Sequence, residues 1–122
     1  MFVEDTCVTL VPYFKVNEGQ LDAFKALGPK FVEKTKTEAG VIHYAFSFDG
    51  LHAHCREGYD NAAGVLAHLE NVGAILEEAL TLSELARLEV HGPAAELDQL
   101  REPLAGLSPQ FFVLEAGGIR RG

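Results

Sequence analysis

The stretch VIHYAFSFDGLHAHCREGY, residues 41–59, decides the fold, because apolar and polar residues alternate on both sides of Asp49-Gly50. Alternation is the period of a half-buried strand, and Asp-Gly between two such runs is a strong signal for a two-residue hairpin turn. We therefore predict two antiparallel strands joined at these two residues. The expected pairs are Phe48–Leu51, Phe46–Ala53, Tyr44–Cys55 and Ile42–Glu57 on one face, and Ser47–His52, Ala45–His54 and His43–Arg56 on the other.

This hairpin sorts its side chains onto two unlike faces, since successive strand residues point in opposite directions. A one-residue error in register would exchange the two sets, so the position of the turn matters. The face that we expect to meet the helices carries Tyr44, Phe46, Phe48, Cys55, Glu57 and Tyr59, and the opposite face carries His43, His52, His54 and Arg56.

Before the hairpin, the sequence predicts a strand over residues 6–16 and a helix over residues 17–40. Pro12 removes a ladder donor, so this strand is expected at a sheet edge or with a bulge. Asn17 is the expected N-cap of the helix, Gly40 its end and Pro29 the site of a kink. The apolar stripe of the helix is Leu21, Phe24, Leu27, Phe31 and Thr35.

After the hairpin, Asp60 is the expected cap of a second helix that runs to residue 80, with His68 at the edge of its apolar stripe. That stripe consists of Val65, Leu69, Val72 and Leu76. Residues 83–91 form a third alternating strand, with Ala86, Leu88 and Val90 on one side, and Gly92-Pro93 ends it. Residues 94–107 are expected to form a short amphipathic helix that ends at Pro103 or Gly106, and residues 109–117 a last strand.

The order of these elements is βαββαβ followed by a helix and an extra strand, within one domain of 122 residues. It matches the ferredoxin-like, split-βαβ topology, an α+β fold with two helices on one face of a four-stranded antiparallel sheet. We expect a core at about residues 6–91 and a C-terminal extension at about 92–118. The open sheet face favours cover by a second copy, giving a homodimer in which the last strand pairs across the interface.

Composition limits the function classes. The formal charge is −8, and the only basic cluster is Arg120-Arg121, which argues against nucleic-acid binding. No apolar run has the length of a membrane helix, and the first five residues carry acids instead of the basic residues of a signal peptide. We therefore expect a soluble, cytoplasmic protein without membrane contacts. Cys7 and Cys55 are expected to be free thiols.

Several kinds of site find no support. No G-x-G-x-x-G or phosphate-binding loop indicates a nucleotide cofactor, and no serine lies in a strand-turn-helix elbow. Cys55 is interpreted as a buried apolar residue, not a nucleophile. His43 and His54 leave open a metal protein as a third hypothesis, against the interpretation that their face is a hydrated polar surface between subunits.

The remaining candidate is a pocket between the sheet and the helices, with His68 on the second helix facing Glu57 and Tyr59. A mostly apolar pocket with a few polar groups is typical of small-molecule sites. Burial raises the pKa of a carboxyl group and lowers that of an imidazole, so both groups suit proton abstraction near neutral pH. The alternative is that His68 is a core residue whose ring N–H donates to a carbonyl.

Three segments in this order carry a family resemblance: EGQLDAF at 18–24, EAGVIHYAFSFDG at 38–50 and CREGYDNAAGVLAHLENV at 55–72. Over about residues 8–91 the chain resembles the antibiotic biosynthesis monooxygenase (ABM) family, within the dimeric α+β barrel superfamily. The resemblance implies a homodimer with a pocket between sheet and helices. Some members of this family oxygenate phenolic or hydroquinone-like compounds without metal or flavin, and the resemblance implies that this chain could have the same activity.

Carried over residue by residue, the resemblance makes Glu57, Tyr59 and His68 the site candidates. Our hypothesis is a cofactor-independent monooxygenase in which His68 is the base, helped by Glu57, with no metal and no cofactor. The alternative is a non-catalytic dimeric barrel that binds a small hydrophobic ligand. The residues expected to contact the ligand are Tyr44, Phe46, Cys55, Tyr59 and Asn71.

The chain departs from the family pattern in two ways. It has no tryptophan, although several members place one in the pocket, and this argues against a haem-degrading role. Its C-terminal extension is an addition to the family core, which we expect to alter dimerisation or to cover the pocket.

Overall fold

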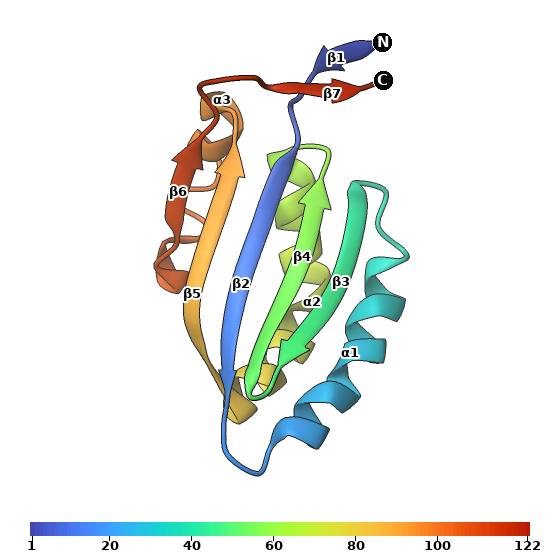
Figure 1. Cartoon of the computed structure of the whole chain (residues 1–122), viewed down its shortest axis with the longest axis vertical. Helices are drawn as coiled ribbons and strands as arrows, with labels where there is room; N and C mark the ends of the chain where they lie inside the picture. The colour runs from blue at the N-terminus through green and yellow to red at the C-terminus, as the bar shows by residue number, and fades with distance from the viewer.

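A five-stranded sheet with helices packed on one face forms the body of the protein (Figure 1). The computed structural model describes residues 1–122. The strand order is β3-β4-β2-β5-β6, with β6 parallel to β5 and the other pairs antiparallel, which confirms the ferredoxin-like α+β fold. The elements of this body are β2 (Val8–Val16), α1 (Leu21–Thr35), β3 (Val41–Asp49), β4 (His52–Tyr59), α2 (Ala62–Leu82), β5 (Ser83–Gly92), α3 (Ala94–Asp98), a 3-10 turn (Ala105–Leu107) and β6 (Gln110–Val113).

The β3–β4 hairpin keeps the predicted faces although its turn is displaced by one residue. Asp49 pairs with His52, so the turn residues are Gly50 and Leu51 and the predicted Asp49-Gly50 turn is wrong. Gly50 has φ +57°, and a glycine with positive φ at the first turn position is the pattern of a type II′ turn. From His43 to Asp49 each pairing moves by two residues, which preserves the face of these side chains. The register shifts between Val41 and His43, so the predicted pairing of Ile42 with Glu57 is wrong and Ile42 is exposed. The observed pairs include Phe48–Ala53, Phe46–Cys55, Tyr44–Glu57, Ser47–His54 and Ala45–Arg56.

Pro12 lies in β2, which is the central strand of the sheet and not the predicted edge strand. A bulge lies next to Pro12, where the β2–β5 register shifts between Tyr13 and Phe14, but its extra residue is in β5 and not in the strand of Pro12 as predicted. This extra residue, Ala86, is exposed and Leu85 packs against the core, so the predicted grouping of Ala86 with Leu88 and Val90 on one face is wrong.

Both helices differ from the prediction at their ends, while their buried stripes are confirmed. Helix α1 follows Gln20, not Asn17, and ends at Thr35, which leaves residues 36–40 as a loop. The N-cap of α2 is Asn61 instead of Asp60: its side-chain oxygen accepts a hydrogen bond from the Gly64 N–H at 3.0 Å. Buried residues are Phe24, Leu27, Phe31 and Thr35 on α1, and Val65, His68 and Val72 on α2.

The C-terminal extension packs against the domain but does not form the predicted helix over residues 94–107. Helix α3 stops at Asp98, and turns and a 3-10 segment follow. Leu97, Leu100 and Leu104 are nevertheless fully buried, in one cluster with Val8 and Val90. Strand β6 pairs with β5 of its own chain, so the predicted pairing of this strand across a dimer is not what this chain shows.

The two chain ends form a small ribbon that the sequence did not predict. Strand β1 (Phe2–Glu4) pairs antiparallel with β7 (Ile119–Arg121), and both lie beyond the end of the main sheet, with the termini side by side at the top of Figure 1. The ribbon exposes apolar side chains, including Phe2 and Ile119.

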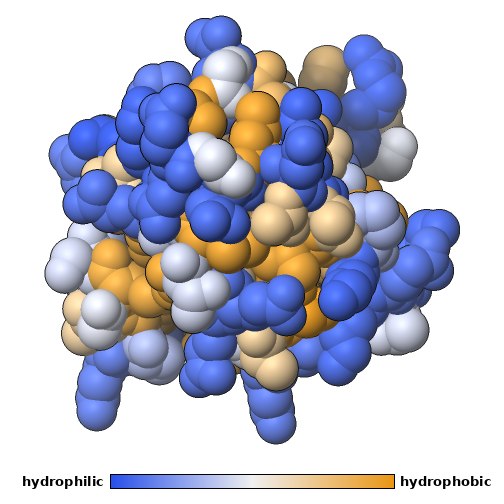
Figure 2. All heavy atoms as spheres, turned by 90° about the horizontal axis from the view of Figure 1, so that it is seen from below, coloured by the Kyte–Doolittle hydropathy of each residue, from blue (hydrophilic) through white to orange (hydrophobic).

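Figure 2 views the molecule from the end that is lowest in Figure 1 and shows hydrophobic residues at the surface between hydrophilic ones. Phe48 and Ile42 are among the exposed apolar residues of the chain.

None of the helices combines the length and the apolar character needed to cross a bilayer. Cys7 and Cys55 are both free thiols, as predicted.

Leu100 tests whether the extension belongs to the core. Its side chain is fully buried. We expect Leu100→Ala to lower the free energy of unfolding by about 2–5 kcal/mol, since truncation leaves a cavity among packed leucines. The matched control Ile119→Ala removes methyl groups from a side chain that is 59% exposed and should change stability by about 0.5 kcal/mol or less. Urea unfolding measures both, and a loss for Leu100→Ala no larger than that of the control would show that the extension only rests on the surface.

Candidate active site

An apolar pocket lies where the two core clusters meet, between the sheet, α2 and the C-terminal extension. Its cavity volume is about 40 Å³, which is smaller than the usual range for small-molecule sites, so a ligand of ordinary size enters only if the side chains of the wall move apart. Thirteen of its 16 lining residues are hydrophobic, so any ligand here leaves water almost completely. Leu104 and Leu107 show that the extension forms part of the wall, as predicted. The other lining residues include Leu10, Phe14, Phe31, Tyr44, Phe46, Cys55, Glu57, His68, Leu69, Val72 and Leu76.

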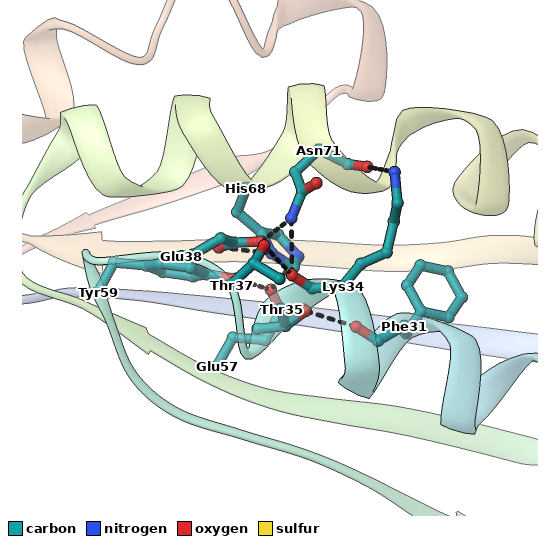
Figure 3. A network of polar contacts seen from close by, with 9 residues as sticks. All are labelled: Phe31, Lys34, Thr35, Thr37, Glu38, Glu57, Tyr59, His68 and Asn71. Atoms are coloured by element: carbon teal, nitrogen blue, oxygen red, sulfur yellow. Dashed lines mark hydrogen bonds and ion pairs between the residues drawn. The ribbon is translucent and has the colours of Figure 1, made fainter.

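Glu57 and His68 bring ionisable groups to the buried end of this pocket. Glu57 is 3% exposed and His68 is 2% exposed, whereas Leu69 and Leu107 are only half-buried. The Nε2 atom of His68 lies 3.4 Å from Oε1 of Glu57, and the Tyr59 hydroxyl donates to the same oxygen at 2.6 Å (Figure 3). The two predicted catalytic residues therefore lie side by side.

Glu38 completes the cluster from the loop after α1. Its two carboxylate oxygens lie 3.1 and 3.0 Å from Nδ1 of His68. With Nδ1–H donating to this carboxylate, the tautomer is fixed and Nε2, which faces the carboxyl group of Glu57, carries the lone pair. A carboxylate that orients a histidine in this way is a common support for a general base.

Asn71 and Lys34 hold Glu38 in place (Figure 3). The Asn71 amide donates to Oε2 of Glu38 at 2.8 Å and to the backbone oxygen of Lys34 at 2.9 Å. In return, the Lys34 ammonium donates to the backbone oxygen of Asn71 at 3.1 Å. These contacts fasten α1 to α2 next to the site.

Burial shifts the pKa values of the site in opposite directions. Loss of water and then the charge of Glu38 raise the pKa of Glu57 to about 8, against the opposing hydrogen bonds from Tyr59 and Cys55. Loss of water lowers the pKa of His68, and Glu38 counteracts part of that shift. Glu57 therefore carries a proton at neutral pH while His68 does not, which pairs an acid with a base.

The remaining polar groups of the pocket are kept neutral. Loss of water raises the pKa of the Tyr44 hydroxyl and of the Cys55 thiol, so neither ionises near neutral pH. The thiolate is the nucleophilic form of cysteine, and Cys55 therefore suits a lining role. The Tyr44 ring packs against His68 with its centroid 5.1 Å away.

The structure separates the predicted ligand-contacting residues into two groups. Tyr44, Phe46 and Cys55 line the pocket. Tyr59 and Asn71 do not: Tyr59 is fully buried behind Glu57, and Asn71 lies on the far side of Glu38.

Glu38 was missing from the sequence prediction. The helix was expected to continue to Gly40, which gave this residue a place on a helical surface. The early end of α1 at Thr35 instead turns the chain so that Glu38 reaches His68. In the sequence, the Glu-Ala-Gly segment contributes only to the family resemblance.

The opposite face of the hairpin carries His43, His52 and His54, as predicted. His54 stacks on Tyr13, and its Nδ1 lies 2.9 Å from the backbone oxygen of Pro12. His43 packs over Gly58, and its Nδ1 has no hydrogen-bond partner. No group of three or more His, Cys, Asp or Glu side chains has the geometry of a metal site, so the metal hypothesis gains no support from these residues.

Comparison with known proteins gives one strong match. No family model and no curated protein matches the sequence. Among solved structures, MupZ from Pseudomonas fluorescens is 48% identical over 93% of both chains, with a TM-score of 0.89. A putative antibiotic biosynthesis monooxygenase from Nitrosomonas europaea is 14% identical over 77% of this chain and 96% of its own, with a TM-score of 0.66. Another from Chloroflexus aurantiacus is 20% identical over 72% and 93%, with a TM-score of 0.60. At these identities the last two show the fold alone.

Glu57 gives a pH prediction that needs no substrate. Between about pH 4.5 and 8 the folded protein keeps the Glu57 proton that the unfolded chain loses, so the free energy of unfolding falls as pH rises through this window. Glu57→Gln keeps the shape without the ionisation. Relative to the wild type, we expect this variant to gain stability from pH 5 to pH 8 in urea unfolding. The control Glu33→Gln alters an exposed carboxylate and should follow the wild type. Parallel curves for all three proteins would mean that Glu57 is not held protonated.

Proposed function

The chain belongs to the family of MupZ and has the ABM fold, and we propose that it is an enzyme in which His68 acts as general base on a small, largely apolar substrate. The observation that supports this proposal is the buried row Glu38–His68–Glu57, which ends at an apolar pocket. The carboxylate of Glu38 fixes the tautomer of His68, and burial keeps its Nε2 unprotonated.

The reaction that we propose first is the cofactor-independent oxygenation of a quinol- or phenol-like compound. Nε2 of His68 takes the proton of the substrate hydroxyl, and the resulting phenolate is electron-rich enough to give an electron to dioxygen. One oxygen atom enters the substrate and the other leaves as water, with all electrons supplied by the substrate. The apolar wall excludes bulk water from the charged intermediate.

The neighbours of His68 have supporting parts in this proposal. Protonated Glu57 donates a hydrogen bond to a substrate oxygen, and Tyr59 holds its carboxyl group in place. The rings of Tyr44 and Phe46 contact the aromatic substrate, and Cys55 fills the wall between them. No tightly held cofactor enters this scheme.

A second candidate is a proton-transfer reaction that uses no oxygen. It is favoured by the close approach of a protonated acid and a neutral base, with 3.4 Å between Oε1 of Glu57 and Nε2 of His68. Such a pair gives a proton to one substrate atom and takes one from another, as bifunctional acid–base catalysis requires. A non-catalytic barrel that binds a small hydrophobic ligand is the remaining alternative.

We place the protein in the cytoplasm. Its two free thiols are in keeping with a reducing compartment.

Oxygen uptake with a panel of quinols and phenols tests the enzymatic proposal. We expect His68→Ala to lower the rate by about a hundredfold to ten-thousandfold, because general-base catalysis contributes that much. Glu57→Gln should have a smaller effect, since the amide still donates a hydrogen bond. The matched control His52→Ala removes an exposed histidine from the opposite sheet face and should leave the rate unchanged. An unchanged rate in His68→Ala would remove this residue from the mechanism. Turnover without oxygen uptake would favour the second candidate, and ligand stabilisation without turnover would favour the binding protein.

We also propose that the protein is a homodimer that joins through the open face of the sheet. No element of the chain covers this face, which lies toward the viewer in Figure 1. Tyr13 is 38% exposed there and stacked on His54. Contact with a second sheet buries the tyrosine ring.

Tyr13→Asp tests this interface. A carboxylate in the centre of two facing sheets has no compensating partner, so we expect the variant to be monomeric in analytical ultracentrifugation at concentrations where the wild type is dimeric. Lys25→Asp, which changes an exposed residue on α1, is the control and should remain dimeric. A wild-type protein that sediments as a monomer at all concentrations would contradict the proposal.

A further inference from the structure

Glu38 faces a second opening of the protein, which we call the rear cleft. It is lined by the loop after α1 and by the first turns of α2, and it is open to solvent. Glu38 and Asn71 lie in its wall, and Figure 3 shows both beside His68. The full lining is Thr37, Glu38, Ala39, Gly40, Asp60, Asn61, Ala63, Gly64, Ala67 and Asn71.

The pocket and the rear cleft share no lining residue. His68 and Glu57 line the pocket, whereas Glu38 lines the cleft. The imidazole of His68 stands between them, with Nε2 near Glu57 and Nδ1 bonded to Glu38. The imidazole ring of His68 thus lies between the apolar pocket and the polar rear cleft, with one nitrogen on each side.

We propose that Glu38 is a proton-relay residue, which carries protons between His68 and the solvent of the rear cleft, so that substrate and protons reach the imidazole from different sides. The inference rests on the proposed role of His68 as base and adds the route by which that base is reset.

The number of protons on His68 and Glu38 is conserved over a full cycle of the relay. A proton taken up by Nε2 makes the ring an imidazolium, the Nδ1 proton moves along the hydrogen bond to Glu38, and the carboxyl group releases it to water in the cleft. The reverse passage brings a proton from the cleft to Nδ1 and delivers the Nε2 proton to the product. Both passages together restore the starting tautomer, with no net gain of protons.

The surroundings of the ring favour this route over one through the pocket. The pocket wall is mainly hydrocarbon, and the pKa of each of Tyr44, Cys55 and Tyr59 is raised so that none of them readily gives up its proton. Glu57 has no contact with the rear cleft. On the other side, Glu38 lies in the wall of the solvent-open rear cleft, and Asn71 keeps its carboxylate facing the ring.

The exchange of the His68 Nδ1 proton with water, measured by saturation transfer in nuclear magnetic resonance, tests the relay without any substrate. We expect Glu38→Gln to slow this exchange by about tenfold or more, because the amide oxygen still accepts from Nδ1–H but its group does not carry a proton. Formate added to Glu38→Ala should restore exchange, since it fits the vacated site as a carboxylate. The matched control Asp60→Asn removes one charge from the same cleft without touching His68 and should exchange at the wild-type rate.

A second pair of variants tests the proton relay even if the Glu38 variants do not fold. Ala67→Leu narrows the rear cleft from an exposed position and should slow the exchange, whereas Leu107→Phe narrows the pocket and should not. The opposite pattern, or wild-type exchange in a folded Glu38→Gln, would overturn the relay. Neither result depends on whether the protein turns over a quinol, so failure of the relay is distinguishable from failure of the proposed reaction.

Discussion

The burial of ionisable groups away from water is the constraint on which the site depends. An unpaired charge in an apolar interior is costly, and Glu57, His68 and Glu38 are all buried within one hydrogen-bonded cluster. The cluster meets this constraint by distributing protons unequally. Glu57 keeps its proton, His68 gives its proton up, and the carboxylate of Glu38 accepts from His68 and from Asn71. This unequal distribution of protons lowers the cost of burying the three groups, and it also leaves one acid and one base side by side.

Two features of the backbone create this cluster. The register of the β3–β4 hairpin turns Glu57 and Cys55 toward α2, and the end of α1 at Thr35 lets the following loop return Glu38 to His68. The Asn71 bonds to Glu38 and to the backbone of Lys34 then tie this loop to α2. The site is therefore held by contacts between elements far apart in sequence.

The sequence predicted those parts of the site that depend on periodicity. Strand alternation put Glu57 on the helix-facing side, and it did so although the turn was displaced, because a shift of two residues preserves the face. Helical spacing likewise predicted His68 at the edge of the apolar stripe of its helix, and the structure shows its side chain buried. Glu38 lay beyond this reasoning, since the end of α1 is set by tertiary contacts and not by the Gly40 that follows. The helix predicted over residues 94–107 is wrong for a related reason: its leucines are buried, but Leu100 and Leu104 lie in turns that follow the short helix α3.

The C-terminal extension bears both on the comparison with known structures and on the wall of the pocket. The two ABM structures match 72% and 77% of this chain, which is too little to include both the core and the whole extension, whereas MupZ matches 93%. Leu104 and Leu107 of the extension line the same pocket as Glu57. Loss of water is the largest cause of the raised pKa of Glu57. The extension thus forms part of the apolar surroundings of Glu57, a contribution that the ferredoxin-like sheet and its two helices alone do not supply.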